Sequence, residues 1–297
     1  MPTTPIVDAH LHLWDTATHP WYTPRLREFL TAAGKPDLAD NLLLPDYLRA
    51  AAPTELAGLV HISAATAPHA YLAETRWIDA IATKSNLPMA IIATVDPTLP
   101  LPDLLAHLEE QSHSRHFRGI HVYQGLSPNT AAADAIASWL QDRDLVFDLV
   151  AHPATMLDWI DFLAGYPTLR VVLEHLGLPQ GTDPDSRTAW HNALSLAAKE
   201  TPWLCKLSGL GMIAPDLTWP TLSSCLEPAL NLWGWRRLMF ASNMPIDTLA
   251  GPYSTLLTTI DHLVASDATD QEAEFFYRTN ATETYGLSPA RIDDPAN

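Results

Sequence analysis

The sequence is poor in cysteine and in basic residues. Its 297 residues include two cysteines, Cys205 and Cys225. Two are too few for a disulfide framework, so we expect reduced thiols, with Cys205 in a buried strand. Lys and Arg number 17 against 34 Asp and Glu, which gives a formal net charge of −17. So acidic a surface repels nucleic-acid phosphates and anionic membranes, and we expect neither as a partner.

Long hydrophobic runs and two common sequence signatures are also missing. No apolar run approaches the roughly 18 residues that a membrane-spanning helix needs. No basic segment followed by an apolar segment opens the sequence, so we expect a cytoplasmic protein without a secretion signal of the usual form. No Gly-x-Gly-x-x-Gly turn follows the first expected strand, which weighs against a dinucleotide-binding fold.

Short apolar runs alternate with longer amphipathic segments through most of the chain. Eight runs are apolar on both faces, as strands are when helices cover them; they span residues 5–9, 57–62, 89–95, 119–122, 145–150, 170–173, 203–207 and 238–241. Helical spacing is found at 71–83, 103–111, 131–142, 154–165, 186–200, 221–232, 253–264 and 270–285. Eight alternations predict an α/β fold, a single-domain (β/α)8 TIM barrel, in preference to an open doubly wound sheet.

Two regions interrupt this alternation. Residues 14–44 are aromatic and rich in proline, and they follow the first strand at the end where a barrel carries its active-site loops. We interpret them as an insertion that forms a substrate loop or lid, or as a loop that only packs over the mouth of the barrel. Residues 288–297 are polar, and we expect them to be a frayed tail. The sequence therefore predicts one barrel domain over residues 1–287.

Two histidines at the end of the first expected strand indicate a functional site. His10 and His12 are two residues apart, so in an extended chain their imidazoles lie on the same side. Paired imidazoles suit a metal ion, or the binding of an anionic or carbonyl-containing substrate. Because a barrel builds its site from the carboxyl ends of its strands, other polar residues at those ends are candidates.

Six of the 13 histidines stand at expected strand ends, together with a lysine, an amide and an acid. These candidates are His10, His12, His61, His121, His152, His175, Lys206, Asn243 and Asp247. A single histidine at a strand end is often only a hydrogen-bonding residue of the fold, so this alternative stays open at positions 61, 121 and 152. Lys206 is either a clamp for a substrate carboxylate or a buried base, or it reaches out of the barrel along its own stem.

Six short motifs carry a family resemblance over nearly the whole chain. They are HLHLWD at 10–15, ETRW at 74–77, RGI at 118–120, LEHLGLP at 173–179, KLSGL at 206–210 and FASNMP at 240–245. In this order they resemble the amidohydrolase-related family, and most closely its lactonase branch of TIM-barrel hydrolases. The resemblance is specific for the family and much less so for a substrate.

The resemblance implies a site made of the paired histidines of strand one, the histidine of strand six and an aspartate at the end of strand eight. Those positions are His10, His12, His175 and Asn243 here. In such lactonases the aspartate activates a water, and the histidines polarise a carbonyl or hold a metal. Relatives include metal-independent enzymes and enzymes that bind zinc or manganese, so the resemblance leaves a metal cofactor open.

Asn243 departs from the family pattern, because an amide is no base at neutral pH and is a weak metal ligand. Glu174 in place of the usual aspartate before His175 is a milder change. Asp247 could supply the missing carboxylate, or His175 could be the general base. A third alternative is a site that binds without turnover.

The leading hypothesis is a hydrolase that opens a cyclic ester or amide, in the first place a lactone of a sugar acid or of an aromatic-degradation intermediate. His10, His12, His175, Asn243 and Asp247 are the expected catalytic residues, and His10, His12 and His175 the metal ligands if a metal is bound. The expected substrate is a small molecule with a carboxylate. The residues expected to bind it are His61, His121, His152 and Lys206. The alternatives are a metal-dependent non-oxidative decarboxylase and a non-catalytic small-molecule binder. The sequence leaves the oligomeric state open, a homo-oligomer included.

Overall fold

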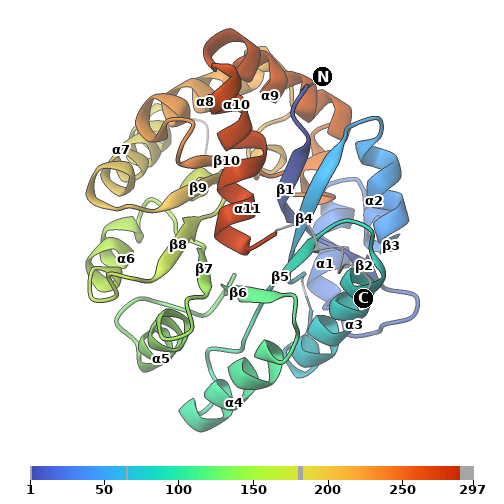
Figure 1. The fold of residues 1–297 in the computed structure, drawn as a ribbon, viewed down its shortest axis with the longest axis vertical. Helices are drawn as coiled ribbons and strands as arrows, with labels where there is room; N and C mark the ends of the chain where they lie inside the picture. Colours follow the sequence, from blue (N-terminus) through green and yellow to red (C-terminus); the bar gives the residue numbers. More distant parts are fainter. Residues whose placement is uncertain (1, 65, 180–182, 288–297) are drawn as a thin grey trace, which may run out of the picture.

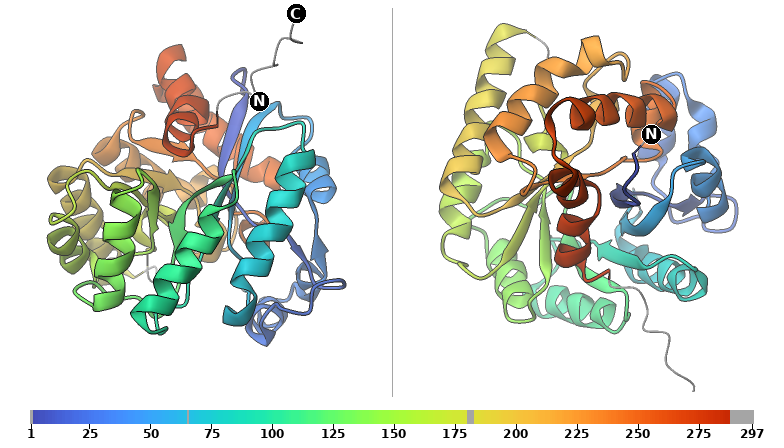
Figure 2. Two further views of the ribbon diagram at one scale, coloured as in Figure 1. Left: turned by 60° about the horizontal axis from the view of Figure 1, so that its bottom comes forward. Right: turned by 45° about the horizontal axis from the view of Figure 1, so that its top comes forward.

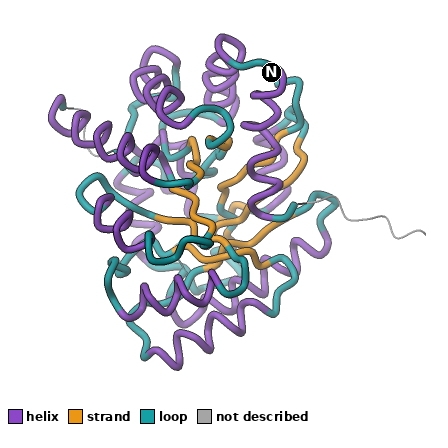
Figure 3. Tube along the Cα trace, turned by 60° about the vertical axis from the view of Figure 1, so that its left-hand side comes forward, coloured by secondary structure: helices purple, strands orange, loops and turns teal. Residues whose placement is uncertain are grey.

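The computed structural model describes residues 2–64, 66–179 and 183–287. Eight parallel strands form one sheet whose order follows the chain, and helices surround them (Figures 1 and 3). The strands are β1 (Ile6–Leu11), β4 (Leu56–Ile62), β5 (Met89–Ala93), β6 (Phe117–His121), β7 (Val146–Leu149), β8 (Arg170–Leu173), β9 (Leu204–Leu207) and β10 (Leu238–Phe240). The predicted (β/α)8 barrel is confirmed, with strand ends within two residues of those expected.

The barrel closes between its first and last strands at their carboxyl ends. The backbone N–H of Asn243 donates to His10 O (2.8 Å), and that of His12 donates to Met244 O (2.8 Å). These bonds lie beyond the last residue of β10. The closure therefore involves the same segments that carry three of the predicted site residues.

The helices outside the sheet lie where the amphipathic spacing predicts them. They are α3 (Tyr71–Lys84), α4 (Leu101–Ser112), α5 (Ala131–Gln141), α6 (Met156–Leu163), α7 (Pro184–Glu200), α8 (Trp219–Trp233) and α9 (Tyr253–Asp267). Capping side chains fix some of the starts. Thr130 accepts a hydrogen bond from Ala133 N–H (3.2 Å) before α5, and Asp183 accepts one from Ser186 N–H (3.0 Å) before α7.

The last expected helix closes the amino-terminal end of the barrel. It consists of α10 (Asp270–Glu274), a π-helical turn (Phe275–Thr279) and α11 (Asn280–Tyr285), and α11 lies across the strands in Figure 1. The Asn280 amide donates to Leu238 O (2.6 Å), and Arg118 Nε donates to Tyr285 O (2.9 Å). The amino end of the barrel is thus plugged, which leaves the carboxyl end for a site.

The barrel interior changes from apolar to polar along the strands. One buried apolar cluster combines the inner faces of the strands with α11: Val7, Ala9, Val60, Ile62, Ala90, Ile92, Val146, Val172, Met239, Ala241, Ala281, Tyr285 and Leu287. Because strand side chains alternate in direction, Asp148 shares a face with Val146, and Glu174 shares one with Val172. These buried acids lie nearer the carboxyl end than the apolar layer.

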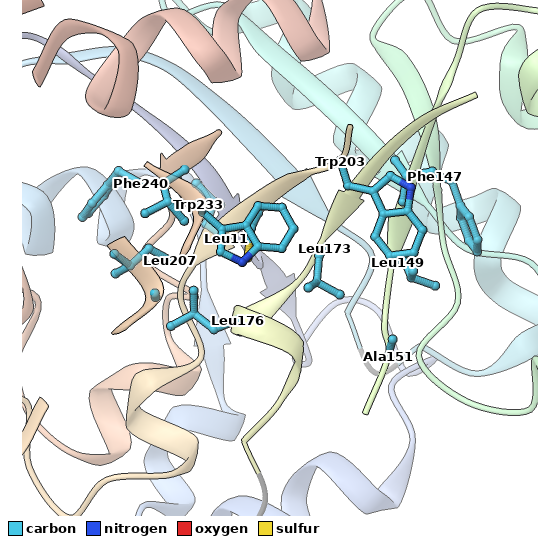
Figure 4. Close-up of a cluster of buried hydrophobic side chains, with 14 of the residues drawn as sticks. Leu11, Phe147, Leu149, Ala151, Leu173, Leu176, Trp203, Leu207, Trp233 and Phe240 are labelled. Carbon is cyan, nitrogen blue, oxygen red and sulfur yellow. The ribbon is translucent and has the colours of Figure 1, made fainter. Parts of the chain in front are cut away.

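A larger apolar cluster fills the space between the strands and the surrounding helices. Figure 4 shows part of it, with Leu173 of β8 and Phe240 of β10 among the strand residues and Trp233 from α8. Cys205 is buried in β9, as expected, and Cys225 is half-buried; both are free. The core thus holds β8 to β10 in place, with the polar side chains on their opposite face.

Residues 14–44 are not the loop that the sequence suggested. They hold β2 (Trp14–Asp15), α1 (Pro24–Ala32), a 3-10 turn (Pro36–Ala39) and β3 (Asn41–Leu42), with β2 antiparallel to β3. Their own small apolar core contains Trp14, Leu26, Leu30, Ala39 and Leu42. The left view of Figure 2 shows this unit at the end of the molecule opposite the N-terminus. Interspersed prolines and aromatics hid the helical spacing.

One further helix, α2 (Leu44–Ala51), was not expected. It is short, and its two buried residues, Tyr47 and Ala51, give only one helical repeat. The expected tail, 288–297, lies outside the described residues. Within the described ranges, no helix combines the length and apolarity needed to cross a membrane.

Candidate active site

A buried ion pair lies inside the barrel near its carboxyl end. The Lys206 ammonium of β9 contacts the Asp148 carboxylate of β7, and both side chains are fully buried. The hydroxyl of Tyr285 donates to Asp148 Oδ1 (2.8 Å). Burial raises the pKa of Asp148 to about 6, and the Lys206 ammonium limits that rise. Lys206 is therefore occupied by an internal partner.

Glu174 is the second buried acid of this group. His121 Nδ1 lies 3.0 Å from Glu174 Oε1, and Lys206 Nζ lies 3.9 Å from the same oxygen. Burial raises the pKa of Glu174, but His121, Lys206 and His175 outweigh it and lower that pKa to about 2. Glu174 Oε2 is buried without a hydrogen-bond partner. An ionised carboxylate oxygen is thus available beside the histidines.

Three imidazoles meet beside Glu174. The Nε2 atoms of His10 and His12 are 3.3 Å apart, the rings of His10 and His175 have centroids 4.5 Å apart, and His175 Nε2 lies 3.7 Å from Glu174 Oε2. His12 Nδ1 is hydrogen-bonded to Ile62 O (3.0 Å), and His175 Nδ1 to Ser208 Oγ (2.8 Å). These bonds orient both rings with Nε2 away from the anchoring atom.

Burial keeps these imidazoles uncharged at neutral pH. It lowers the pKa of His12 to about 4 and that of His175 to about 3, and it lowers the pKa of His10 well below its usual range. Lys206 Nζ, 3.4 Å from His10 Nδ1, acts in the same direction. Neutral imidazoles can bind a metal or exchange hydrogen bonds with a substrate.

Asn243 connects one of the histidines to an acid. Asn243 Nδ2 donates to Asp247 Oδ1 (2.8 Å), and Asn243 N–H donates to His10 O (2.8 Å). Leu210 N–H donates to Asp247 Oδ2 (3.0 Å). Burial raises the pKa of Asp247 to about 7. The carboxylate that the sequence lacks at position 243 is therefore present one hydrogen bond away, at position 247.

The backbone around two site residues is held in a conformation that L-residues rarely adopt. His175 has φ 51° and Asn243 has φ 49°, which costs about 1–2 kcal/mol at each position. Gly209 packs against the first of them, since a Cβ at this position would lie 2.7 Å from His175 Cβ. Strained backbone of this kind clusters at functional sites.

The chain resembles known proteins over nearly its whole length. The chain matches the family model described as Amidohydrolase over residues 7–287. The chain belongs to the amidohydrolase family. It is 28% identical to L-fucono-1,5-lactonase from Burkholderia multivorans, in an alignment that covers 95% of this chain and 96% of the relative.

Two solved structures share the fold of this amidohydrolase. An amidohydrolase from Burkholderia multivorans, crystallised with bound zinc, superposes with a TM-score of 0.81 at 23% identity, covering 96% of this chain and 100% of that one. A probable 2-pyrone-4,6-dicarboxylic acid hydrolase from Acinetobacter baumannii, crystallised with citric acid, gives 0.65 at 16% identity, covering 95% and 100%. The similarity extends over the whole barrel.

The buried side chains of this amidohydrolase fit a divalent metal ion. Ligand atoms of His10, Glu174 and His175 all lie within 4.8 Å of one another. The 3.3 Å between His10 Nε2 and His12 Nε2 suits a hydrogen bond, and it also suits two ligands of one tetrahedral zinc, whose nitrogens lie about 3.3–3.4 Å apart. Imidazole and carboxylate donors suit zinc or manganese. Glu174 thus joins the ligand candidates that the sequence indicated.

The four residues predicted to bind substrate lie in different places. His121 and Lys206 join the buried cluster. His61 lies on the face of β4 opposite Val60 and Ile62, and its Nε2 is 3.4 Å from Leu13 O, so its ring points away from the barrel interior. His152 is half-buried in the turn before α6, where its N–H is bonded to Thr155 Oγ1 (3.2 Å).

Three residues of the site were not recognised as such from the sequence. Asp148 and Glu174 were not among the predicted site residues, although an acid in an apolar run such as 146–149 signals a buried partner. Ser208, which orients His175, carries no signal, since serine is common after strands. The pairing of side chains across strands depends on their shared inward face, which a single strand does not reveal.

Proposed function

We propose that this amidohydrolase opens a lactone by adding water to its ring carbonyl. One observation supports the proposal most: the uncharged imidazoles of His10, His12 and His175 lie together, and Asn243, which holds Asp247, is bonded through its backbone N–H to His10 O (2.8 Å). Such a group can polarise a carbonyl and accept a proton in one place. The 28% identity to an L-fucono-1,5-lactonase over nearly the whole chain also supports it.

Asp247 is the general base of the proposed mechanism. Its pKa of about 7 suits proton transfer at neutral pH, whereas His175, with a pKa of about 3, is a poor base. The proton that Asp247 takes from water passes to the ring oxygen as the C–O bond breaks, which yields the hydroxy acid. Asn243, which cannot itself accept a proton, holds Asp247 through its amide and is joined to His10 through its backbone N–H.

His10, His12 and His175 orient the lactone carbonyl in this proposal. A divalent ion held by His10, His175 and Glu174, with His12 beside them, would supply Lewis-acid polarisation of the carbonyl and a more acidic water. Glu174 and Asp148 supply the negative charge that makes a cation acceptable next to the Lys206 ammonium. The zinc in the Burkholderia amidohydrolase supports such a site.

The substrate class we propose is a neutral lactone of a sugar acid. The expectation of a carboxylated lactone rested on Lys206 and His121. His121 is bonded to Glu174 (3.0 Å), and the Lys206 ammonium is buried against Asp148. A substrate carboxylate would have to displace these internal partners. A neutral, hydroxylated ring needs only hydrogen bonds, which the imidazoles and the Asn243 amide can provide.

The test is base consumption during hydrolysis of L-fucono-1,5-lactone and of a carboxylated lactone, with zinc or manganese added and spontaneous hydrolysis subtracted. We expect turnover of the neutral lactone, and a loss of kcat of about 10²–10⁴-fold in Asp247→Asn. Wild-type rates equal to the background for both lactones would contradict the proposal.

The same assays identify the alternatives. Carbon dioxide release from a hydroxybenzoate by the metal-loaded protein would indicate a decarboxylase. Lactone binding without turnover, with turnover gained in Asn243→Asp, would indicate a binding protein. Either result would replace the lactonase proposal.

A further inference from the structure

The first and last strands of the barrel are joined by few backbone hydrogen bonds. β1 and β10 are the two ends of the sheet order, and one β-bridge, Leu11 to Met244, lies between them in the described residues. The ladder from β1 to β4 is also irregular between Asp8 and Leu11. Two backbone hydrogen bonds, from Asn243 N–H to His10 O and from His12 N–H to Met244 O, therefore carry the pairing at this seam.

The Asp8 carboxylate spans this seam. It is fully buried, and its Oδ1 accepts hydrogen bonds from Ser242 N–H (2.8 Å) after β10 and from His10 N–H (3.2 Å) in β1. Its Oδ2 accepts one from the Tyr47 hydroxyl of α2 (2.7 Å). One oxygen thus binds the backbone of His10 itself and of the residue next to Asn243.

Asp8 does not reach the reacting groups. Its neighbours in β1, Val7 and Ala9, pack in the interior cluster, so the alternating chain directs Asp8 outwards, toward Tyr47. Tyr47 is itself fully buried, and its ring packs edge-on against Tyr253 of α9. The carboxylate is anchored from behind by a helix and faces the backbone of both strands.

We propose that Asp8 is a positioning residue that sets the separation between the imidazoles of strand one and the Asn243–Asp247 pair. A buried carboxyl group needs hydrogen-bond partners, and Asp8 obtains them only when both strands and α2 are in place. The chemical roles of the positioned groups rest on the proposed function. Their placement relative to one another does not.

Asn280 of α11 offers a matched control, because its amide binds the backbone at the start of β10. It is buried, and its amide donates to Leu238 O (2.6 Å) and Trp235 O (2.9 Å). Leu238 is the first residue of β10 and stands five residues before Asn243. Asn280→Ala therefore removes buried hydrogen bonds to the β10 segment without touching the seam beside His10.

The experiment compares Asp8→Asn, Asp8→Ala, Tyr47→Phe and Asn280→Ala. We expect kcat for the lactone to fall about tenfold in Asp8→Asn and about 100-fold in Asp8→Ala, with KM changed much less. Asn280→Ala should lower the melting temperature and leave kcat unchanged. If Asp8→Ala does not fold, the positioning role is tested with Asp8→Asn and Tyr47→Phe, which keep most of the hydrogen bonds around Asp8.

A second readout does not depend on turnover. Imidazole ¹H–¹⁵N spectra should show shifted ring signals of His10 and His12 in the Asp8 variants and unshifted signals in Asn280→Ala. If the wild type hydrolyses no lactone, the proposed function fails and these spectra alone test the positioning role. Unshifted signals in Asp8→Asn, or a loss of kcat in Asn280→Ala equal to that in Asp8→Asn, would overturn the inference.

Discussion

Burial shifts the pKa of several titratable side chains in the site. The same loss of water that raises the pKa of Asp247 to about 7 lowers the pKa of His175 to about 3. An acid thereby becomes the group that titrates near neutral pH, and the imidazole becomes a neutral ligand or donor. This reverses the roles that the unperturbed pKa values of aspartate and histidine would suggest.

The pH dependence of kcat/KM tests this assignment. Asp247 must be deprotonated to accept a proton, so activity is low below its pKa and rises as pH increases through about 7. The measurement is a profile of kcat/KM between about pH 5 and 9 with the spontaneous rate subtracted. Asp247→Asn should remove the inflection together with most of the activity. An unchanged inflection in that variant would assign the titration to another group.

Removing the buried ammonium should be strongly destabilising. Lys206→Met leaves Asp148 with Tyr285 as its hydrogen-bond donor and takes a positive charge away from Glu174. We expect the free energy of unfolding, measured by urea denaturation, to fall by about 3–5 kcal/mol. Adding Asp148→Leu should restore part of it, because no unpaired carboxylate then stays at that position. A double variant less stable than Lys206→Met would contradict this account.

At the level of elements, the turns after β8 and β9 determine the position of His175. His175 follows β8 with a left-handed backbone, and the glycine-containing turn after β9 packs against it. A Cβ at Gly209 would lie 2.7 Å from His175 Cβ, while Gly34, with a similar positive φ, has no atom within 4 Å of such a Cβ. Substitutions at these two glycines can therefore distinguish the effect of backbone strain from the effect of a steric contact.

Gly34→Ala should cost about 1–2 kcal/mol of stability through its left-handed conformation alone and leave kcat unchanged. Gly209→Ala carries the same strain and in addition displaces His175, so both stability and kcat should fall further. Urea denaturation and lactone turnover measure the two effects. Equal stability losses with unchanged kcat in both variants would show that the contact with His175 has no consequence.

The elements of the barrel could be predicted because local pattern determines them. Runs apolar on both faces mark strands, and each of the eight was found within two residues of its expected ends. The unit over residues 14–44 could not be predicted in the same way, because its helix starts at Pro24 and its core combines separated positions such as Trp14 and Leu30. These contacts join residues far apart in the sequence, and the spacing of apolar residues along the chain does not reveal them.

The candidate site could be predicted as far as the positions of the strand ends could be predicted from the sequence. Their shared position places His10, His12 and His175 together. The partners of Lys206 and the role of Asp8 depend on which face each residue occupies and which strand lies opposite. A bulge near His10 changes the face locally, and no local rule in the sequence reveals it.

At the scale of the whole molecule, the closed barrel brings side chains from separate strand ends together, where they could bind one metal ion. His10, Glu174 and His175 come from the first and sixth barrel strands, and they converge only when the sheet has closed. A metal bound there would bind the folded state alone, and it would therefore stabilise the whole chain. At a free ion concentration 100 times its dissociation constant, the gain would be about 2.7 kcal/mol.

Elemental analysis and thermal melts test this coupling. Protein purified without added metal should contain about one zinc or manganese per chain, and the variant His10→Ala/His12→Ala should contain none. Added zinc should raise the melting temperature of metal-stripped wild type and leave that of the variant unchanged, because the gain requires the assembled ligands. An equal rise in both would place the ion elsewhere on this acidic surface. A wild type that neither retains nor responds to metal would assign carbonyl polarisation to the neutral imidazoles themselves.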